Sequence, residues 1–452
     1  MRPTVFICHS KDSSDHALVI ASFLAARGFE LKRFCIGDNY ATVPKRFEIL
    51  LFLSTDEALD QVGKSESSIR RLVEAATRLG TRVFNVAVSP KLSANRLPPL
   101  YLPLAKLFMS ETNISERTLS LLAQLIQPAI KPDFDAELEA MRVSKAELTS
   151  LVEGVIRTFP EDRRLAFESA SVIAAKAFSK SAAITSGGEL LRHSTNRESA
   201  ERSILVRAVL CGYIIDLARR EPLGFTNSID LRSIWPILYP TLSGVSGIPL
   251  TASYGSQRFI TIPIFLNGTN KNLKELIRLH IWDTSFIDDS RFRTDNPFAI
   301  HSHRFYAKSW ILKGELVNSF FSIRELEGEN EESEFSFFDV VWDDEHNEKA
   351  DRLRSAVINS GRLVRVTRES TAVIQEGQSY EIDHTAFHSS FFDYERSSQA
   401  LTASIFIFDA TRGHDDRTDV VGPTSIERFS VERDIALDPQ GYIEKLNFQL
   451  GR

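Results

Sequence analysis

The chain has 452 residues, of which 43% are apolar and 25% are charged, and its formal net charge is −6. This length is too great for one ordinary hydrophobic core, so two or three domains are expected, and the composition excludes a disordered or fibrous protein. Acidic and basic residues are interleaved without a basic stripe, so nucleic acid is not expected as a partner.

Residues 1–130 show strands alternating with helices. The apolar run Thr4–Cys8 is typical of a buried parallel strand, and the helical pattern that follows it ends at Gly28. Further strands are predicted at 29–35, 49–54 and 83–88, with an amphipathic helix over 67–79. This alternation predicts a parallel sheet covered by helices on both faces.

Residues 131–235 have the pattern of helices only. Apolar residues recur at three- and four-residue spacing over 138–141, 148–156 and 172–178, and the run 204–217 is the most apolar of these segments. This run is too short to span a bilayer, so it is interpreted as the buried helix of a small bundle. We expect the segment to connect two domains and to mediate self-association into a homo-oligomer.

Residues 236–452 change to short strand-like runs separated by Gly, Asn, Asp and Glu. The clearest runs are 259–265, 307–312, 316–323, 335–342, 363–366, 371–375 and 403–408. Many short strands at close spacing predict an all-β sandwich or barrel.

Histidines in this last segment have the spacing of metal ligands. His301 and His303 are separated by one residue, and in a strand this spacing places both imidazoles on one face. A third donor must come from a neighbouring strand, for which His384 and His388 are both candidates. Three neutral imidazoles leave coordination positions open, as a reactive metal site requires.

Residues 295–410 resemble the cupins, in particular the three-histidine thiol dioxygenases of the cysteine-dioxygenase kind. The His-x-His pair is followed by Ser309, by Lys313-Gly314-Glu315-Leu316 and by Phe320-Phe321, similar to that family's first metal-binding hairpin. Gly377 and Tyr380 precede His388 at the family's spacing. The resemblance therefore implies a cupin β-barrel with a divalent metal, Fe(II) above all, on His301, His303 and His388, with zinc, nickel or manganese as alternatives.

One departure from that family affects the expected chemistry. The family carries a Ser-x-His-x-Tyr set beside the metal, and the corresponding stretch here is Ser404–Phe408, with Phe406 and Phe408 at the histidine and tyrosine positions. Phenyl rings neither donate nor relay protons, so oxidation of cysteine itself is not expected. No catalytic residue is assigned.

Residues 3–110 resemble a degenerate TIR domain. Val5–Asp12, then Asp15-His16 and a helix ending in Ala25-Ala26-Arg27-Gly28-Phe29, are similar to the start of that family. In active bacterial TIR domains a glutamate assists cleavage of NAD, and the resemblance puts Leu72 at its position, with Glu74 two residues away. Two residues turn a helix by about 200°, so Glu74 is expected on the other side, and NAD hydrolysis is disfavoured.

Two functions follow as expectations. In the first, the cupin is a metal-dependent, dioxygenase-like module that acts on or senses a small molecule and is coupled to the TIR-like module. In the second, the protein is a TIR-type signalling or anti-phage defence component in which the cupin is a regulatory ligand-binding domain.

Cys8, Cys35 and Cys211 have no metal-ligand spacing, and no segment has the length of a membrane span, so a cytoplasmic protein without membrane association is expected.

Overall fold

The computed structural model forms two compact units. It describes residues 3–36, 47–55, 58, 72–73, 75–76, 81–88, 107–109, 114–126, 132–164, 167–178, 183–194, 199–220, 229–242, 250–255, 259–268, 272–287, 297–326, 332–342, 354–392, 400–432 and 439–451. Unit 1 comprises residues 1–128, 317–322 and 367–374, and unit 2 comprises the remaining residues. Two segments that follow residue 300 therefore belong to unit 1.

Unit 1 contains a parallel sheet, as the alternation of strands and helices predicts. Its strands are β1 (Thr4–His9), β2 (Glu30–Cys35), β3 (Ile49–Ser54), β4 (Arg82–Ala87) and β5 (Leu107–Met109). They lie in the order β2-β1-β3-β4-β5, and all neighbours are parallel. This order occurs in doubly wound α/β sheets. The segment 367–374 adds an antiparallel neighbour to β5 through Ser370, Thr371 and Ala372.

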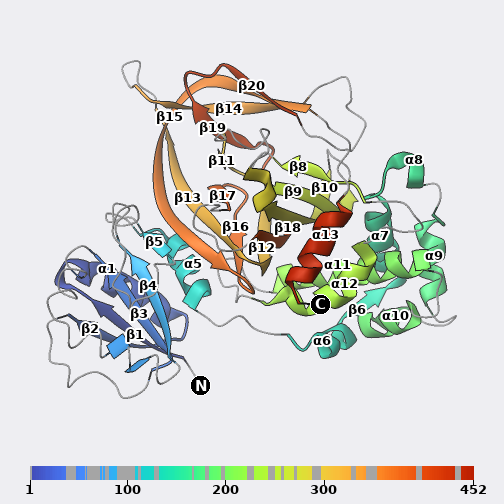
Figure 1. Cartoon of the computed structure of the whole chain (residues 1–452), viewed down its shortest axis with the longest axis horizontal. Coiled ribbons are helices and arrows are strands. Elements are labelled where there is room, and N and C mark those ends of the chain that lie inside the picture. The colour runs from blue at the N-terminus through green and yellow to red at the C-terminus, as the bar shows by residue number, and fades with distance from the viewer. Residues whose placement is uncertain are drawn as a thin grey trace. The chain divides into compact units, whose positions relative to one another are not determined.

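Helices and apolar side chains bury the sheet of unit 1. Helix α1 (Ser14–Ala26) contacts β1, β2 and helix α5 (Glu116–Ile126). These helices and strands are labelled in Figure 1. A separate apolar cluster joins Phe6 and Phe52 to Leu72, which is 1% exposed. An apolar side chain buried in this way explains why leucine occupies the position. Glu74 lies outside the described residues.

Unit 2 begins with the helices that the sequence predicts. Its helical segments are α6 (Phe134–Ala140), α7 (Lys145–Ile156), α8 (Glu161–Arg164), α9 (Ala170–Ala177), α10 (Gly187–Ser194), α11 (Ser199–Arg220), η3 (Leu231–Ile234) and α12 (Trp235–Leu242). A small two-stranded ribbon of β6 (Arg142–Ser144) and β7 (Ile184–Ser186) lies among them. A further helix, α13 (Gln440–Gln449), follows the strands of the unit in chain order. In the described part of the chain, no helix combines the length and apolar character needed to cross a membrane.

The strands of unit 2 form two antiparallel arrays. The first is the sheet β16 (Ser379–Ile382), β12 (Phe305–Lys313), β18 (Leu401–His414), β10 (Leu273–Asp283), β9 (Phe259–Gly268) and β8 (Ser253–Gly255), in that order. The second contains β13 (Glu315–Glu325), β17 (Phe387–Phe391), β11 (Ile300–His301), β19 (Asp419–Pro423), β14 (Phe335–Trp342) and β15 (Arg354–Gln375), in that order, with β20 (Arg428–Glu432) paired to β15. The long strands β13 and β15 also supply the two late segments of unit 1.

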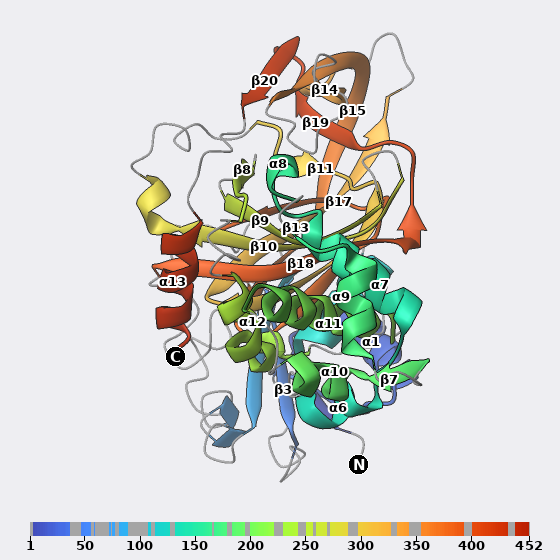
Figure 2. The ribbon, with the colours of Figure 1, turned by 90° about the vertical axis from the view of Figure 1, so that its right-hand side faces the viewer.

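The helices pack on one face of the first sheet. Figure 2 shows α7, α11 and α12 beside β9, β10 and β18; α7 contacts β9, and α11 contacts β9 and β18. One apolar cluster contains residues of the helices, such as Val152 and Leu210, together with Ile262, Leu279 and Ile405 of the sheet. Residues at these strand positions alternate, so their neighbours in each strand point to the opposite face of the sheet.

Candidate metal centre

Strand pairing brings two of the three predicted ligands together. The short strand β11 pairs antiparallel with β17, and His301 is directly opposite His388 in this register. β11 also pairs with β19 on its other side, through Ile300 and His301. Side chains directly opposite in an antiparallel pair point to the same face, about 5 Å apart at Cβ. The sheet therefore fixes the relative position of these two imidazoles.

His303 is placed differently from what the sequence predicts. The prediction put His301 and His303 on one strand, but β11 ends at His301 and the chain then turns from the second array into β12 of the first sheet. The backbone N–H of Ser302 donates to the carbonyl of Asp419 (2.9 Å), and the N–H of Asp419 donates to Oγ of Ser302 (3.1 Å). These two hydrogen bonds fix the turn that carries His303.

The three imidazoles converge all the same. One ligand atom from each of His301, His303 and His388 lies within 4.8 Å of the other two. The ring centroids are 4.7 to 4.8 Å apart, and Nε2 of His303 is 2.7 Å from Nε2 of His388. The structure thus brings the three predicted residues together.

Hydrogen bonds on the far side of the rings orient two of the ligands. Nδ1 of His301 is 3.0 Å from the carbonyl of Ala299, which accepts only if Nδ1 carries the proton. Nδ1 of His388 is 3.3 Å from Oγ of Ser390, which is in turn 3.2 Å from the hydroxyl of Tyr380. In both histidines the engaged nitrogen is Nδ1, so Nε2 is the atom left to face the centre.

Burial keeps the site uncharged. Desolvation lowers the pKa of His301, although the hydrogen bond to Ala299 opposes this shift. Desolvation, with smaller contributions from His301, His280 and Arg278, lowers the pKa of His303 well below its usual range. Imidazoles that are neutral near pH 7 have the lone pairs that a metal ion needs. The donor set therefore fits a divalent cation such as iron or zinc.

An aromatic wall lies beside the imidazoles. The ring of His303 is 5.0 Å from Phe408 and 6.0 Å from Phe406, the two residues singled out from the sequence. Lys308, on strand β12, is fully buried, and its Nζ lies 3.5 Å from a carboxylate oxygen of Glu381. The other histidine candidate, His384, has its Nδ1 2.5 Å from Asp383 and is not in the three-histidine group.

Sequence reasoning missed another histidine near the centre, His280, which is buried. His280 lies on β10, stacks on Phe406 at 4.9 Å, and contributes to lowering the pKa of His303. Charged residues such as Lys274, Glu275 and Arg278 interrupt the apolar pattern of this strand. The sequence signal for His280 was the run Leu-His-Ile-Trp at 279–282. In this run histidine and tryptophan alternate with leucine and isoleucine, as in a strand with one apolar face.

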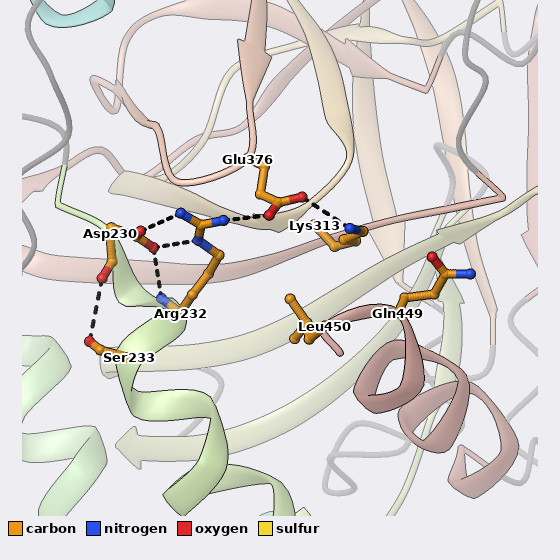
Figure 3. A pocket seen from close by; sticks show the side chains of 7 residues that line it. All are labelled: Asp230, Arg232, Ser233, Lys313, Glu376, Gln449 and Leu450. Carbon is orange, nitrogen blue, oxygen red and sulfur yellow. Dashed lines mark hydrogen bonds and ion pairs between the residues drawn. The ribbon is translucent and has the colours of Figure 1, made fainter. Parts of the chain in front are cut away.

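A separate hollow of about 340 Å³ in unit 2 is lined by seven residues, shown in Figure 3. Arg232 binds the carboxylates of Asp230 and Glu376. Glu376 also forms an ion pair with Lys313, whose Nζ lies 3.3 Å from a carboxylate oxygen of Glu376. Because these charges neutralise one another, the hollow is better explained as an ionic network than as a ligand site.

Comparison with known proteins does not identify a family for this chain. No protein-family model matches the sequence, and no curated protein matches it. Among solved structures, hydroxypropylphosphonic acid epoxidase from S. wedmorenis matches with 8% identity and a TM-score of 0.18, covering 59% of this chain and 98% of the epoxidase. The capsular polysaccharide assembling protein CapF from Staphylococcus aureus matches with 9% identity and a TM-score of 0.17, covering 89% and 96% of the two chains. A structure titled FeII HppE matches with 9% identity and a TM-score of 0.16, covering 59% and 100%. TM-scores this low do not indicate a shared fold.

Proposed function

We propose that the chain binds one divalent metal ion on His301, His303 and His388, in a cupin-like module that acts on or senses a small molecule. Iron(II) is the expected metal, with zinc, nickel and manganese as alternatives that also accept imidazole. The observation that carries the proposal is the convergence of the three ligand atoms within 4.8 Å. The hydrogen bonds of His301 and His388 support it, because they leave Nε2 of each ring toward the common point.

When bound, such a metal would supply a Lewis acid with open positions for a ligand. The chain's own residues define its surroundings. Phe406 and Phe408 present apolar surface beside His303, exclude water there and cannot transfer a proton. Nε2 of His303 and Nε2 of His388 are 2.7 Å apart, and a neutral ring that carries its proton on Nε2 would have to move it to Nδ1 before that Nε2 could bind a metal.

For the parallel sheet of unit 1 we propose a TIR-like scaffold that responds to ligand binding in unit 2. The burial of Leu72 supports a structural role over NAD hydrolysis, because no carboxylate stands at that position. A signalling or defence role, with the three-histidine module as its regulator, is the alternative. Loss of NAD in the presence of purified chain, abolished by Glu74→Ala and unaffected by His301→Ala, would favour that alternative.

Metal analysis of the purified full-length protein tests the central proposal. We expect about one equivalent of metal per chain in the wild type and after reconstitution with Fe(II) under anaerobic conditions. His301→Ala and His388→Ala should each reduce retained metal severely, because two imidazoles hold a divalent ion far less tightly than three.

His384→Ala is the matched control. This histidine is in the same segment as His388 but outside the three-histidine group. It should retain the metal of the wild type. Equal metal content in the wild type and both ligand variants, or a loss only in His384→Ala, contradicts the proposal.

A further inference from the structure

Three polar side chains form a row across the first sheet of unit 2. In the registers of β9, β10 and β18, His280 is the direct partner of Thr261 on one side and of Ser404 on the other. Trp282 lies two residues after His280 on the same strand. Direct partners share a face of a sheet, and so do residues two apart in a strand. All four side chains therefore occupy one face.

This face is the one toward the three imidazoles. Leu279, Ile281 and Ile405, which alternate with the row, pack into the apolar cluster of the helices on the other face. Phe406 is two residues after Ser404, and its ring lies between those of His280 at 4.9 Å and His303 at 6.0 Å. The ring of Phe406 thus contacts both His280 of the row and His303 of the candidate metal centre.

The four side chains are buried, and each has one polar atom that makes no hydrogen bond within the described part of the chain. Thr261, His280, Trp282 and Ser404 are 8%, 6%, 2% and 0% exposed. Oγ1 of Thr261, Nε2 of His280, Nε1 of Trp282 and Oγ of Ser404 make no hydrogen bond to a described residue. Each buried polar atom left in this state costs about 1–3 kcal/mol, so four in one place call for a common explanation.

We infer that this row is the polar end of a small-molecule subsite beside the three imidazoles, and that its ligand presents a carbonyl or carboxylate oxygen from an aromatic or alicyclic body. An oxygen acceptor matches Trp282, whose indole N–H can only donate, and the hydroxyl groups of Thr261 and Ser404, which flank His280 on two different strands, can donate to separate polar atoms of the ligand. Phe259 and Phe406, which pack against the ring of His280 at 4.3 and 4.9 Å, give the surroundings of the row the aromatic character that a ring body would contact.

The charge of the row agrees with this ligand class. Burial, with a smaller contribution from Arg278, lowers the pKa of His280 well below its usual range, so the ring is neutral near pH 7. The residues of the row include no acid, so nothing in it attracts a cationic group. The inference rests on the proposed function and adds a ligand class to it. The row itself contains none of the three proposed metal ligands.

Isothermal titration of the full-length protein with three probes tests the inference. Benzamide, benzoate and benzylamine share a ring and differ in the polar group: a neutral acceptor, an anionic acceptor and a cationic donor. We expect benzamide and benzoate to bind and benzylamine not to bind. Ser404→Ala, Thr261→Val and Trp282→Phe should each raise the Kd of the binding probes about fivefold, the loss expected from one hydrogen bond.

Two controls make the result interpretable. Ser194→Ala removes a buried hydroxyl in helix α10 whose partner is the carbonyl of Leu191, and it should leave the Kd unchanged. The same titrations on His301→Ala, with metal content measured in parallel, separate the two proposals: a failure of metal binding leaves the row intact. Equal binding of benzylamine, unchanged Kd values in all three row variants, or no binding by any probe, in which case water alone fills the row, would overturn the inference.

Discussion

The outer nitrogens of His301 and His388 have different partners, and this difference bears on metal affinity. His301 faces a backbone carbonyl, whereas His388 faces the hydroxyl of Ser390, which is itself next to the hydroxyl of Tyr380. A hydroxyl can donate or accept, so Tyr380 and Ser390 together determine which tautomer His388 adopts. These two residues are therefore positioning residues for the third ligand.

Removing the hydroxyl of Ser390 should weaken metal binding. We expect Ser390→Ala to lower the affinity for Fe(II) or Co(II) about ten- to a hundredfold, and Tyr380→Phe to lower it less, because Tyr380 acts through Ser390. Competition titration with a chelator gives the affinity, and the visible spectrum of the Co(II) form reports ligand geometry. Ser389→Ala is the control, since this residue points to the other face of β17. An equal loss in Ser389→Ala would show that the effect is not specific to the hydrogen bond.

The buried neutral histidines predict how stability depends on pH in the metal-free protein. The pKa values of His280, His301 and His303 are lowered in the folded chain, whereas an unfolded histidine titrates near 6.5. As the pH falls below about 6.5, the unfolded chain takes up protons that the folded chain refuses, so the free energy of unfolding decreases. Each such group contributes a slope of up to about 1.4 kcal/mol per pH unit.

Urea unfolding between pH 7.5 and 5 measures this slope. We expect His280→Phe to reduce the slope by about one third, because one of the three groups no longer titrates. His193→Phe is the control, since this histidine lies on helix α10, away from the three-histidine group. A stability that rises as the pH falls through this range contradicts the prediction.

At the scale of an element, the turn between β12 and β13 depends on Gly314. Its φ is +74°, in the region that favours glycine, and an added Cβ would lie 2.3 Å from Oγ1 of Thr402 and 2.8 Å from the carbonyl of Leu401. Both the backbone conformation and the contact with β18 therefore exclude a side chain.

Gly314→Ala should destabilise the protein by about 2–4 kcal/mol, from backbone strain and the collision together. Gly361→Ala is a sharp control, because Gly361 has a φ of +76° but no atom within 4 Å of an added Cβ. It should cost only about 1 kcal/mol, the strain alone. Chemical denaturation of both variants gives the comparison, and equal losses would mean that the contact with Thr402 and Leu401 is unimportant.

The strands show what a sequence can and cannot predict. Runs dominated by large apolar residues, such as 49–54 and 335–342, were predicted with the observed bounds. Strand β10 was missed because Lys274 and Arg278 break its pattern, and β15 was divided into two runs because Arg368 and Glu369 lie within it. Charged residues are tolerated where part of a strand is accessible to water, and a local pattern cannot reveal this.

The same limit applies to the candidate site. Spacing alone drew attention to His301 and His303, and the resemblance selected His388 over His384. Spacing could not show that the chain changes sheets between His301 and His303, because that turn depends on Asp419, more than a hundred residues away. Nor could it reveal His280, which lies near the centre, behind Phe406, only because β10 pairs with β18.

At the scale of unit 2, charge pairs and apolar packing both join the helices to the first sheet. Arg219, at the end of α11, binds the carboxylate of Asp409 on β18 through two nitrogens and that of Glu275 on β10 through one. Asp409 is fully buried, and its pKa is lowered by the hydrogen bond from Arg219 despite its desolvation. The opposite face of the same sheet carries the polar row and the aromatic wall, so this attachment stabilises the layer on which the proposed ligand site depends.

Removing Arg219 should therefore have a large effect, because a buried carboxylate would lose its counter-charge. We expect Arg219→Ala to lower the free energy of unfolding by about 3–5 kcal/mol, with the loss reduced in acid as Asp409 becomes protonated. The neighbouring Arg220 offers a matched control: its partners Asp216 and Glu137 are much more exposed, so Arg220→Ala should cost no more than about 1 kcal/mol. Denaturation at pH 7 and pH 4.5 distinguishes the two variants. Similar small losses for both arginines would mean that apolar packing alone attaches the helices, and that the charge pairs contribute specificity rather than stability.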